Sequence, residues 1–207
     1  MSTKPILFNT EMVRAIMDGR KTCTRRIIKG FIPNDAVWGY TAFTPKGCIS
    51  CRGTFADGYG EKFFKLPYQS GDILYARETW HKYIKRVGKG KNCHLAEFYG
   101  YKASVANLED ADEPWKPSIH MPKEAARIWL KVTDVRVERL QEITLKQICK
   151  EGVEVEEPYV LNGEEKRYAF SNLWNSTIKK SDLDRYGWNA NPWVWVIEFE
   201  RCEREVE

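Results

Sequence analysis

The sequence lacks any long run of apolar side chains. Its longest unbroken aliphatic and aromatic run, Trp193–Ile197, has five residues in a chain of 207, whereas a membrane-spanning helix needs about 20. Ile6–Phe8 near the amino terminus is followed at once by polar residues and is too short for the apolar region of an export signal. We therefore expect a protein that has no membrane partner and stays in the cytoplasm.

Cysteine is scarce as well, with six residues. This density is too low for a disulfide-stabilised scaffold, so we expect the thiols to be reduced and buried. Cys48 and Cys51, together with Cys93 and His94, are four possible ligands of the kinds that tetrahedral zinc accepts. More than 40 residues separate the two pairs, and the second pair is adjacent in sequence rather than spaced. We expect no metal there, and we expect no cofactor.

The sequence also has no glycine-rich phosphate loop, no Ser-His-Asp pattern and no paired carboxylates. Apolar residues make up 43% and aromatic residues 13% of the chain, which excludes wholesale disorder. The net charge of +4 is unevenly distributed: residues 1–103 hold 18 Lys or Arg and 8 Asp or Glu, and residues 104–207 hold 15 and 21. This asymmetry favours a basic face that meets phosphates, although an ordinary solvated dipolar surface explains it too.

Hydrophobic periodicity predicts mostly strands, with three helices between them. The first helix follows Thr10, which we expect to cap it, and ends before Gly19. Thr144 and Gln147 form a capping box for a second helix that runs to Glu151. The third helix spans Ala169–Lys179. The expected strands are Lys4–Asn9, Thr22–Ile28, Ile73–Trp80, Glu97–Ala103, Arg127–Arg139 and Pro192–Arg201. This order predicts one α+β domain built on a small mixed barrel.

Other stretches of the sequence show no sustained hydrophobic periodicity. Residues 29–69 contain six glycines and three prolines and are too long for an ordinary connection, so we expect an ordered insertion of unknown conformation. Lys82–Lys91 has five basic residues, no acid and two glycines, and this composition predicts a mobile basic loop. An acidic loop is expected at Glu109–Glu113, followed by a proline-punctuated segment at Pro114–Pro122.

Arg20–Arg26 (RKTCTRR) is the densest cluster of chemically useful side chains. Neighbouring arginines disfavour the ammonium form of Lys21 and make its neutral amine more accessible as a base. A hydroxyl such as that of Thr24 needs an activating base before it can act as a nucleophile. The alternative is that Arg20, Arg25 and Arg26 bind phosphate or line a solvated edge, with Thr24 an ordinary strand residue.

Four blocks of sequence point to a known family. They are residues 4–26 (KPILFNTEMVRAIMDGRKTCTRR), 68–80 (YQSGDILYARETW), 115–130 (WKPSIHMPKEAARIWL) and 192–200 (PWVWVIEFE). Together they resemble the ASCH-domain family, and the phage- and prophage-encoded branch looks closest. The resemblance covers about half of the chain and implies a PUA-like β-barrel, with insertions at about 29–67, 81–114 and 153–190.

The resemblance further implies a cleft suited to RNA, single-stranded nucleic acid or modified nucleosides. One compact branch of the family consists of N4-acetylcytidine amidohydrolases, whose lysine and threonine lie in a K-T-x-T segment that matches Lys21 and Thr24. Their glutamate lies seven residues after a helix-starting threonine, a spacing that Thr144 and Glu151 reproduce. The implied roles are Lys21 as base, Thr24 as nucleophile or water-orienting hydroxyl, and Glu151 as proton shuttle. Because residues three apart in a strand face opposite sides, Lys21 must approach Thr24 from the turn before the strand.

Three further residues are candidates for ligand binding. Glu78 and Trp80 share a strand face and pair a carboxylate with a surface on which a base can stack, unless they are a surface glutamate and a core tryptophan. His120 is a candidate base near neutral pH, or a structural hydrogen-bonding group. A different class of function also fits: a phage protein-interaction or assembly module without catalytic activity, which makes contact through its aromatic-rich segments 29–69 and 153–190.

Overall fold

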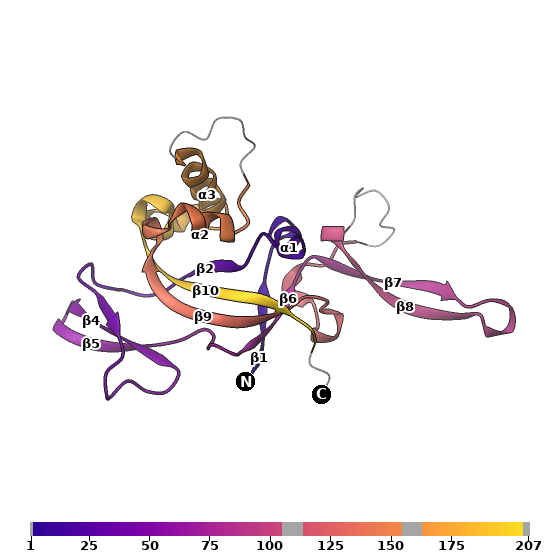
Figure 1. Cartoon of the computed structure of the whole chain (residues 1–207), viewed down its shortest axis with the longest axis horizontal. Helices are drawn as coiled ribbons and strands as arrows, with labels where there is room; N and C mark the ends of the chain where they lie inside the picture. Colours follow the sequence, from indigo (N-terminus) through magenta and orange to yellow (C-terminus); the bar gives the residue numbers. More distant parts are fainter. Residues whose placement is uncertain (1, 105–113, 155–162, 205–207) are drawn as a thin grey trace. The chain divides into compact units, whose positions relative to one another are not determined.

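The protein is an α+β structure dominated by strands. The computed structural model describes residues 2–104, 114–154 and 163–204, and Figure 1 shows the arrangement of its elements. The strands are β1 (Thr3–Leu7), β2 (Cys23–Ile27), β3 (Val37–Gly39), β4 (Cys48–Phe55), β5 (Gly58–Lys65), β6 (Ile73–Arg77), β7 (Trp80–Val87), β8 (His94–Tyr101), β9 (Trp129–Arg139) and β10 (Trp193–Cys202). The α-helices are α1 (Thr10–Met17), α2 (Leu145–Lys150), α3 (Glu164–Ser176) and α4 (Leu183–Tyr186).

Three sheets contain these strands. The largest has the order β1-β6-β9-β10-β2, a second has the order β3-β4-β5, and β7 pairs with β8 alone. Strands β1 and β6 are parallel, whereas β6 with β9 and β10 with β2 are antiparallel. Among the described residues the largest sheet has two different end strands and does not close on itself. The α+β class is therefore confirmed, and the PUA-like barrel stays a prediction.

The chain divides into two compact units. Unit 1 comprises residues 1–21, 72–131 and 201–207, and unit 2 comprises residues 22–71 and 132–200. The polypeptide crosses between the units inside β9 and β10, so each of these strands contributes residues to both. The predicted single domain is not tested by this division, and each unit is described below by itself.

The core of unit 1 lies around β6, β7 and the start of β9. Its buried members are Ile73, Tyr75, Trp80, Met121, Ala125, Ala126 and Trp129. Helix α1 buries Val13 and Ile16 as its periodicity predicts. Its cap is Asn9, whose side chain accepts a hydrogen bond from the Met12 amide at 2.8 Å, rather than the expected Thr10. Asparagine caps well because its short side chain reaches the exposed amides of the first turn.

The core of unit 2 is built from both strands and helices. Inward-facing Cys23, Val194 and Val196 of β2 and β10 pack with Leu140, Ile143, Ile148, Phe170 and Trp174. The predicted capping box of α2 is confirmed, since Thr144 and Gln147 each bond the backbone of the other. Helix α3 is also confirmed, although it begins at Glu164, before the predicted start.

Two predictions for segments outside the four family-like sequence blocks are wrong. The predicted mobile loop Lys82–Lys91 is wrong, because most of it belongs to β7, which pairs with β8 along its whole length. Lysine and arginine are tolerated in a strand whose side chains are exposed, so their charge did not indicate a loop. The thiols of Cys93 and Cys149 are exposed rather than buried. The predicted acidic loop Glu109–Glu113 lies outside the described residues. Within the described residues, none of the helices is long and apolar enough to span a bilayer.

Replacement of Ile148 by alanine tests the core of unit 2. Ile148 is completely buried, so its truncation leaves a cavity and should lower the free energy of unfolding by about 2–5 kcal/mol. Leu145→Ala on the same helix is the matched control, and its loss should be smaller because Leu145 is 38% exposed. Urea denaturation measures both. Equal losses in the two variants would contradict the packing described for α2.

Candidate active site

Buried polar side chains are concentrated in a few segments of the sequence. Seven polar or charged residues are buried in the described chain: Lys21, Thr24, Arg25, Ser50, Asp72, Glu78 and Glu151. Four of these come from Lys21–Arg25 and the end of α2. A buried polar group costs free energy unless it is hydrogen-bonded, so such a concentration identifies a candidate functional site.

Lys21 ends the first segment of unit 1, directly after a tight turn. Gly19, with φ of 75°, adopts the left-handed conformation that terminates α1. The amides of Arg20 and Lys21 then both donate to the Ala15 carbonyl at 2.9 Å. Lys21 therefore precedes β2 and is not part of it. Its side chain is 2% exposed, and its ammonium lies 5.9 Å from the centre of the Phe8 ring.

Strand β2 carries the rest of the segment in unit 2. It pairs with β10 so that Thr24 lies opposite Ile197, Arg25 opposite Val196 and Arg26 opposite Trp195. Because side chains alternate along a strand, Arg25 shares its face with the apolar core residues Cys23 and Val196, and Thr24 shares the other face with Arg26. Thr24 is 1% exposed.

Glu151 is fixed at the end of α2. Its amide donates to the Gln147 carbonyl at 3.0 Å, and Gly152 follows in the left-handed conformation, with φ of 81°. The end of α2 is joined to the start of β2 by a hydrogen bond of 2.9 Å from the Thr22 amide to the Lys150 carbonyl. Helix packing and this bond together hold the Glu151 carboxylate beside β2.

A guanidinium connects these elements electrostatically. Arg25, whose side chain is 1% exposed, donates to Glu151 Oε1 at 3.1 Å and to Glu138 Oε2 at 3.0 Å. Two carboxylates around one buried cation compensate its desolvation, and the planar guanidinium fixes the direction of each oxygen. Arg25 is thus engaged inside the protein and is not presented as a phosphate ligand.

The network continues across β9 and β10. Arg136 donates to Glu138 at 2.6 Å, to Asp134 at 2.7 Å and to Glu198 at 2.8 Å. Lys150 completes it with a bond of 2.9 Å to Glu198. Sequence reasoning missed these residues, although the spacing of Asp134, Arg136 and Glu138 puts them on one face of a strand and was a usable signal.

Their surroundings shift the pKa values of several ionisable side chains in unit 2. Burial lowers the pKa of the Arg26 guanidinium, while Tyr68 and Glu151 raise it less. Burial likewise raises the pKa of the Tyr68 hydroxyl, and Arg26 opposes this. Burial also acts to lower the pKa of Arg136, but its hydrogen bonds to three carboxylates outweigh this and raise it. Arg26, on the face of β2 that also carries Thr24, thus interacts electrostatically with Tyr68.

The remaining candidates lie in unit 1. Glu78 is almost completely buried and receives two bonds from Arg127, at 2.8 and 2.9 Å, so its carboxylate is engaged within the fold. Trp80 belongs to the hydrophobic core, with Lys116 over its ring. His120 is exposed in a short 3₁₀ turn. Arg20 donates to exposed Asp18 at 2.8 Å. The prediction that Glu78 and Trp80 share a strand face is wrong, because β6 ends at Arg77 and β7 begins at Trp80. Trp80 is the core tryptophan of the alternative interpretation, but Glu78 is buried and not a surface residue.

Nothing in the described residues forms a metal centre. No group of three or more His, Cys, Asp or Glu side chains in that part of the chain is arranged to hold a metal ion. Cys48 and Cys51 lie three residues apart on β4, so their side chains point to opposite faces of the strand. A surface pocket of about 350 Å³ next to α3 and α4 is lined by Asn175, Leu183, Asp184, Gly187, Trp188, Asn189 and Ala190, and by none of the predicted site residues.

Comparison of the chain with models of protein families, with curated proteins and with solved structures finds no significant match. The resemblance to the ASCH-domain family therefore stays a prediction from the sequence blocks.

Acid denaturation tests the role of Glu198 in the network. Burial raises the pKa of its carboxyl, but hydrogen bonds from Lys150 and Arg136 outweigh this and bring the pKa below its ordinary value of 4.5. A depressed pKa stabilises the folded state above the unfolded value, and this stability is lost as the pH falls through the folded value. The free energy of unfolding should therefore fall below about pH 4.5, and less steeply in Glu198→Gln. Parallel profiles for the two proteins would contradict this role.

Replacement of Arg25 by methionine tests the buried ion pairs. The change removes a guanidinium from Glu151, which is 5% exposed, and should lower the free energy of unfolding by about 3–5 kcal/mol because a buried charge loses its compensation. The double variant Arg25→Met/Glu151→Gln should recover part of this loss. Chemical denaturation of the single and double variants measures both terms. A loss below about 1 kcal/mol for Arg25→Met would show that Arg25 does not support Glu151.

Proposed function

We propose that this protein hydrolyses the exocyclic amide of N4-acylated cytosine nucleosides and that it does so on a PUA-like, ASCH-type fold. The observation that carries the proposal is the burial of Lys21, Thr24 and Glu151, which are the three residues that match the amidohydrolase motif. They are 2%, 1% and 5% exposed, respectively. Surface residues of these types would be common and uninformative, whereas buried ones need a reason.

Chain connectivity supports a joint role for these residues. Lys21 and Thr24 are three residues apart, so their Cα atoms lie within about 11 Å of each other in any conformation. Lys21 is bonded directly to Thr22, whose amide is held by the carbonyl of Lys150, the residue before Glu151. Within unit 2 this hydrogen bond holds the end of α2 next to the start of β2, and the chain joins Lys21 covalently to Thr22. The turn at Gly19 puts Lys21 before the strand, as the proposed approach to Thr24 requires.

The proposed reaction assigns a role to each side chain. The amine of Lys21 takes the proton from the hydroxyl of Thr24, or from a water that Thr24 orients, and the oxygen attacks the acyl carbon. The carbon–nitrogen bond then breaks, and the N4 amine leaves with the proton that Lys21 took up, which the Glu151 carboxylate relays to it. If Thr24 attacks directly, a water subsequently hydrolyses the acyl-threonine ester. The products are cytidine and the free acid, and neither oxidant nor reductant is consumed.

Chromatographic detection of cytidine released from N4-acetylcytidine tests the reaction. Lys21→Ala, Thr24→Ala and Glu151→Gln should each lower the rate at least about 100-fold, because loss of a working base or nucleophile costs orders of magnitude. Lys131→Ala and Thr133→Ala are matched controls at exposed positions of β9 and should retain the wild-type rate. The proposal fails if the wild type releases no cytidine or if Lys21→Ala equals the wild type.

A protein-interaction module is the second candidate, favoured by the exposed apolar side chains of residues 29–69. Phe31, Val37, Tyr40, Phe43, Tyr59 and Phe63 are all more than 40% exposed. Surface aromatics gathered in one segment are typical of protein interfaces. This function predicts that Tyr40→Ser/Phe43→Ser abolishes capture of a partner from a host lysate while Lys21→Ala does not. The amidohydrolase function predicts the reverse dependence for cytidine release.

A further inference from the structure

The β7–β8 hairpin is the most extended feature of unit 1. Eight residue pairs join the two strands, from Trp80 with Tyr101 to Val87 with His94. Figure 1 shows it as a two-stranded ribbon that extends away from β1 and β6. The connection between the strands contains a 3₁₀ turn at Gly90–Asn92. Gly88 and Gly90 have positive φ, and a side chain at Gly88 would collide with the backbone of Asn92. The hairpin is therefore a defined scaffold and not a loose loop.

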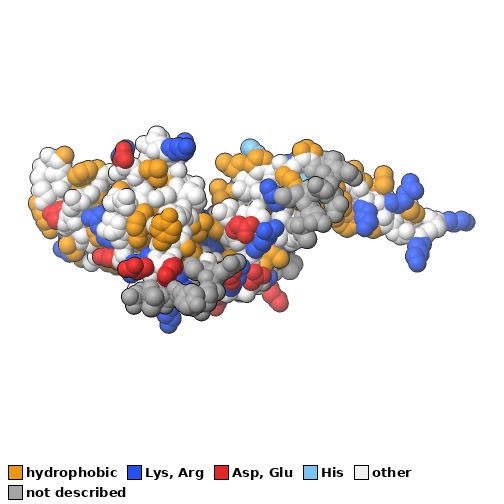
Figure 2. Space-filling model, turned by 90° about the horizontal axis from the view of Figure 1, so that it is seen from above, with side chains coloured by type: hydrophobic (Ala, Val, Ile, Leu, Met, Phe, Trp, Pro, Cys, Tyr) orange, Lys and Arg blue, Asp and Glu red, His pale blue; other side chains and the backbone are white. Residues whose placement is uncertain are grey.

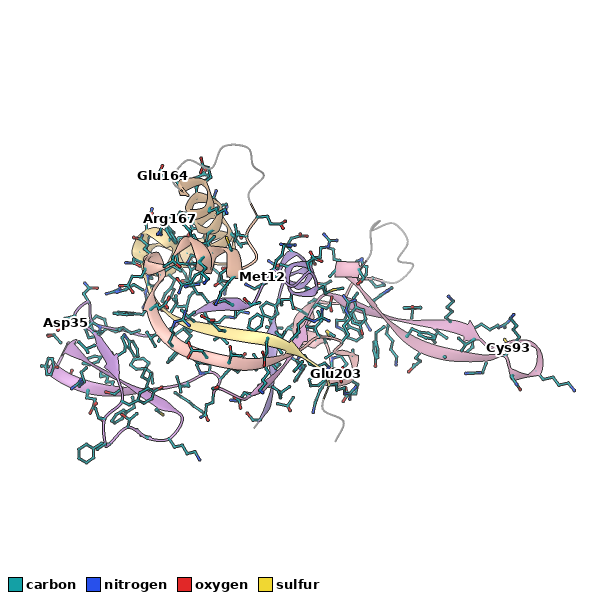
Figure 3. All side chains as sticks on the ribbon, viewed as in Figure 1. Met12, Asp35, Cys93, Glu164, Arg167 and Glu203 are labelled. Carbon is teal, nitrogen blue, oxygen red and sulfur yellow. The ribbon has the colours of Figure 1, made fainter. Side chains whose placement is uncertain are left out.

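Positive charge gathers toward the tip of this hairpin. Lys85, Arg86, Lys89 and Lys91 are exposed, and no acidic residue lies between them in the sequence. Figure 2 shows Lys and Arg side chains along the arm and at its end, and Figure 3 labels Cys93 beside the same turn. Within the described part of the chain, none of these four side chains forms a salt bridge. The acidic Glu97 is paired with Lys82, at 2.7 Å.

One face of the hairpin carries a continuous set of aromatic rings. Because side chains alternate, His81, Tyr83 and Lys85 of β7 share this face with Phe98 of β8. The Tyr83 and Phe98 rings are stacked, with centroids 5.7 Å apart, and the His81 ring lies 5.4 Å from Tyr83. Trp115 extends the set at the base of the hairpin, 4.6 Å from His81.

Gly100 makes this arrangement possible. It lies opposite His81 in the register, and a Cβ at this position would overlap the His81 ring. The missing side chain lets the imidazole lie across β8 between Tyr83 and Trp115. The aromatic rings thus form one surface that leads from the base of the hairpin to Lys85 and the basic tip.

We propose that this hairpin binds single-stranded nucleic acid. Bases stack on the aromatic face, because each base offers a π-face, and the phosphates contact Lys85 on the same face and Lys89 and Lys91 in the turn beyond it. A strand held in this way would present an acylated cytosine within a polynucleotide. The inference rests on the proposed function for the reaction itself, but binding is measured with an unmodified strand and can be tested separately.

Fluorescence anisotropy with a labelled 20-nucleotide oligouridine measures the binding. The variant Lys85→Gln/Lys89→Gln/Lys91→Gln should bind at least about tenfold more weakly than wild type, and its plot of log affinity against log salt should be shallower by about 2, the value for three lost phosphate contacts. Lys46→Gln/Lys146→Gln/Lys179→Gln removes the same charge from exposed positions in unit 2 and should bind as wild type does.

The aromatic face needs its own variants. Tyr83→Leu and Phe98→Leu keep an apolar cross-strand pair but remove a π-face, and each should weaken binding about 5- to 150-fold. A matched duplex should bind more weakly than the single strand, since its bases are not free to stack. The inference is overturned if wild type does not bind, if the basic-tip and control variants bind equally, or if both leucine variants bind as wild type does.

Variants on the opposite face of the hairpin distinguish binding to nucleic acid from binding to a lipid surface. Ile84 and Leu95 are exposed there, at 64% and 68%. Ile84→Ser/Leu95→Ser should leave oligouridine affinity unchanged. The inference is overturned in favour of a membrane if wild type binds phosphatidylserine vesicles but not oligouridine, and if the double variant no longer binds the vesicles. Hydrolysis of free N4-acetylcytidine should be the same in every hairpin variant, so failure to bind the strand leaves the proposed reaction standing.

Discussion

Burial of the Arg25 guanidinium is the constraint on which the candidate site depends. A cation at 1% exposure on the core-facing side of β2 is stable only where carboxylates meet it, and Glu138 and Glu151 do so at 3.0 and 3.1 Å. These contacts fix the end of α2 against β2 and β9, and the Thr22–Lys150 hydrogen bond reinforces the same junction. The position of Glu151 thus follows from charge compensation as well as from helix packing.

The same electrostatic reasoning separates two kinds of basic residue in this protein. Arg25 and Arg136 are surrounded by carboxylates and serve the structure of unit 2. The basic residues at the tip of the β7–β8 hairpin are exposed, form no salt bridges within the described residues, and lie at the end of a hairpin that has one aromatic face. The excess of Lys and Arg over Asp and Glu in residues 1–103 therefore does not amount to one basic surface. We infer that chemistry on the nucleoside and contact with the strand are assigned to different segments of the chain.

Local signals in the sequence predicted local structure well. The Thr144–Gln147 capping box and the glycine after Glu151 located α2, because both act within a single turn of helix. Pairing between distant residues was not predictable: Arg25 lies 113 and 126 residues from its two partners. The β7 strand was missed because five basic residues and two glycines resemble a loop until β8 is seen to pair with it. Lys21, Thr24 and Glu151 came from resemblance, and the structure adds that each is buried.

The central claim is that Lys21, Thr24 and Glu151 form one reaction site, and a crystal structure of the protein with cytidine tests it most directly. The account predicts the cytosine ring next to these residues, with its N4 amine within about 3.5 Å of Thr24 Oγ1 or a Glu151 carboxylate oxygen, and with Lys21 Nζ in reach of the same hydroxyl. Cytidine bound elsewhere, with Lys21 Nζ and Thr24 Oγ1 farther apart than one bridging water can span, about 6 Å, would contradict it.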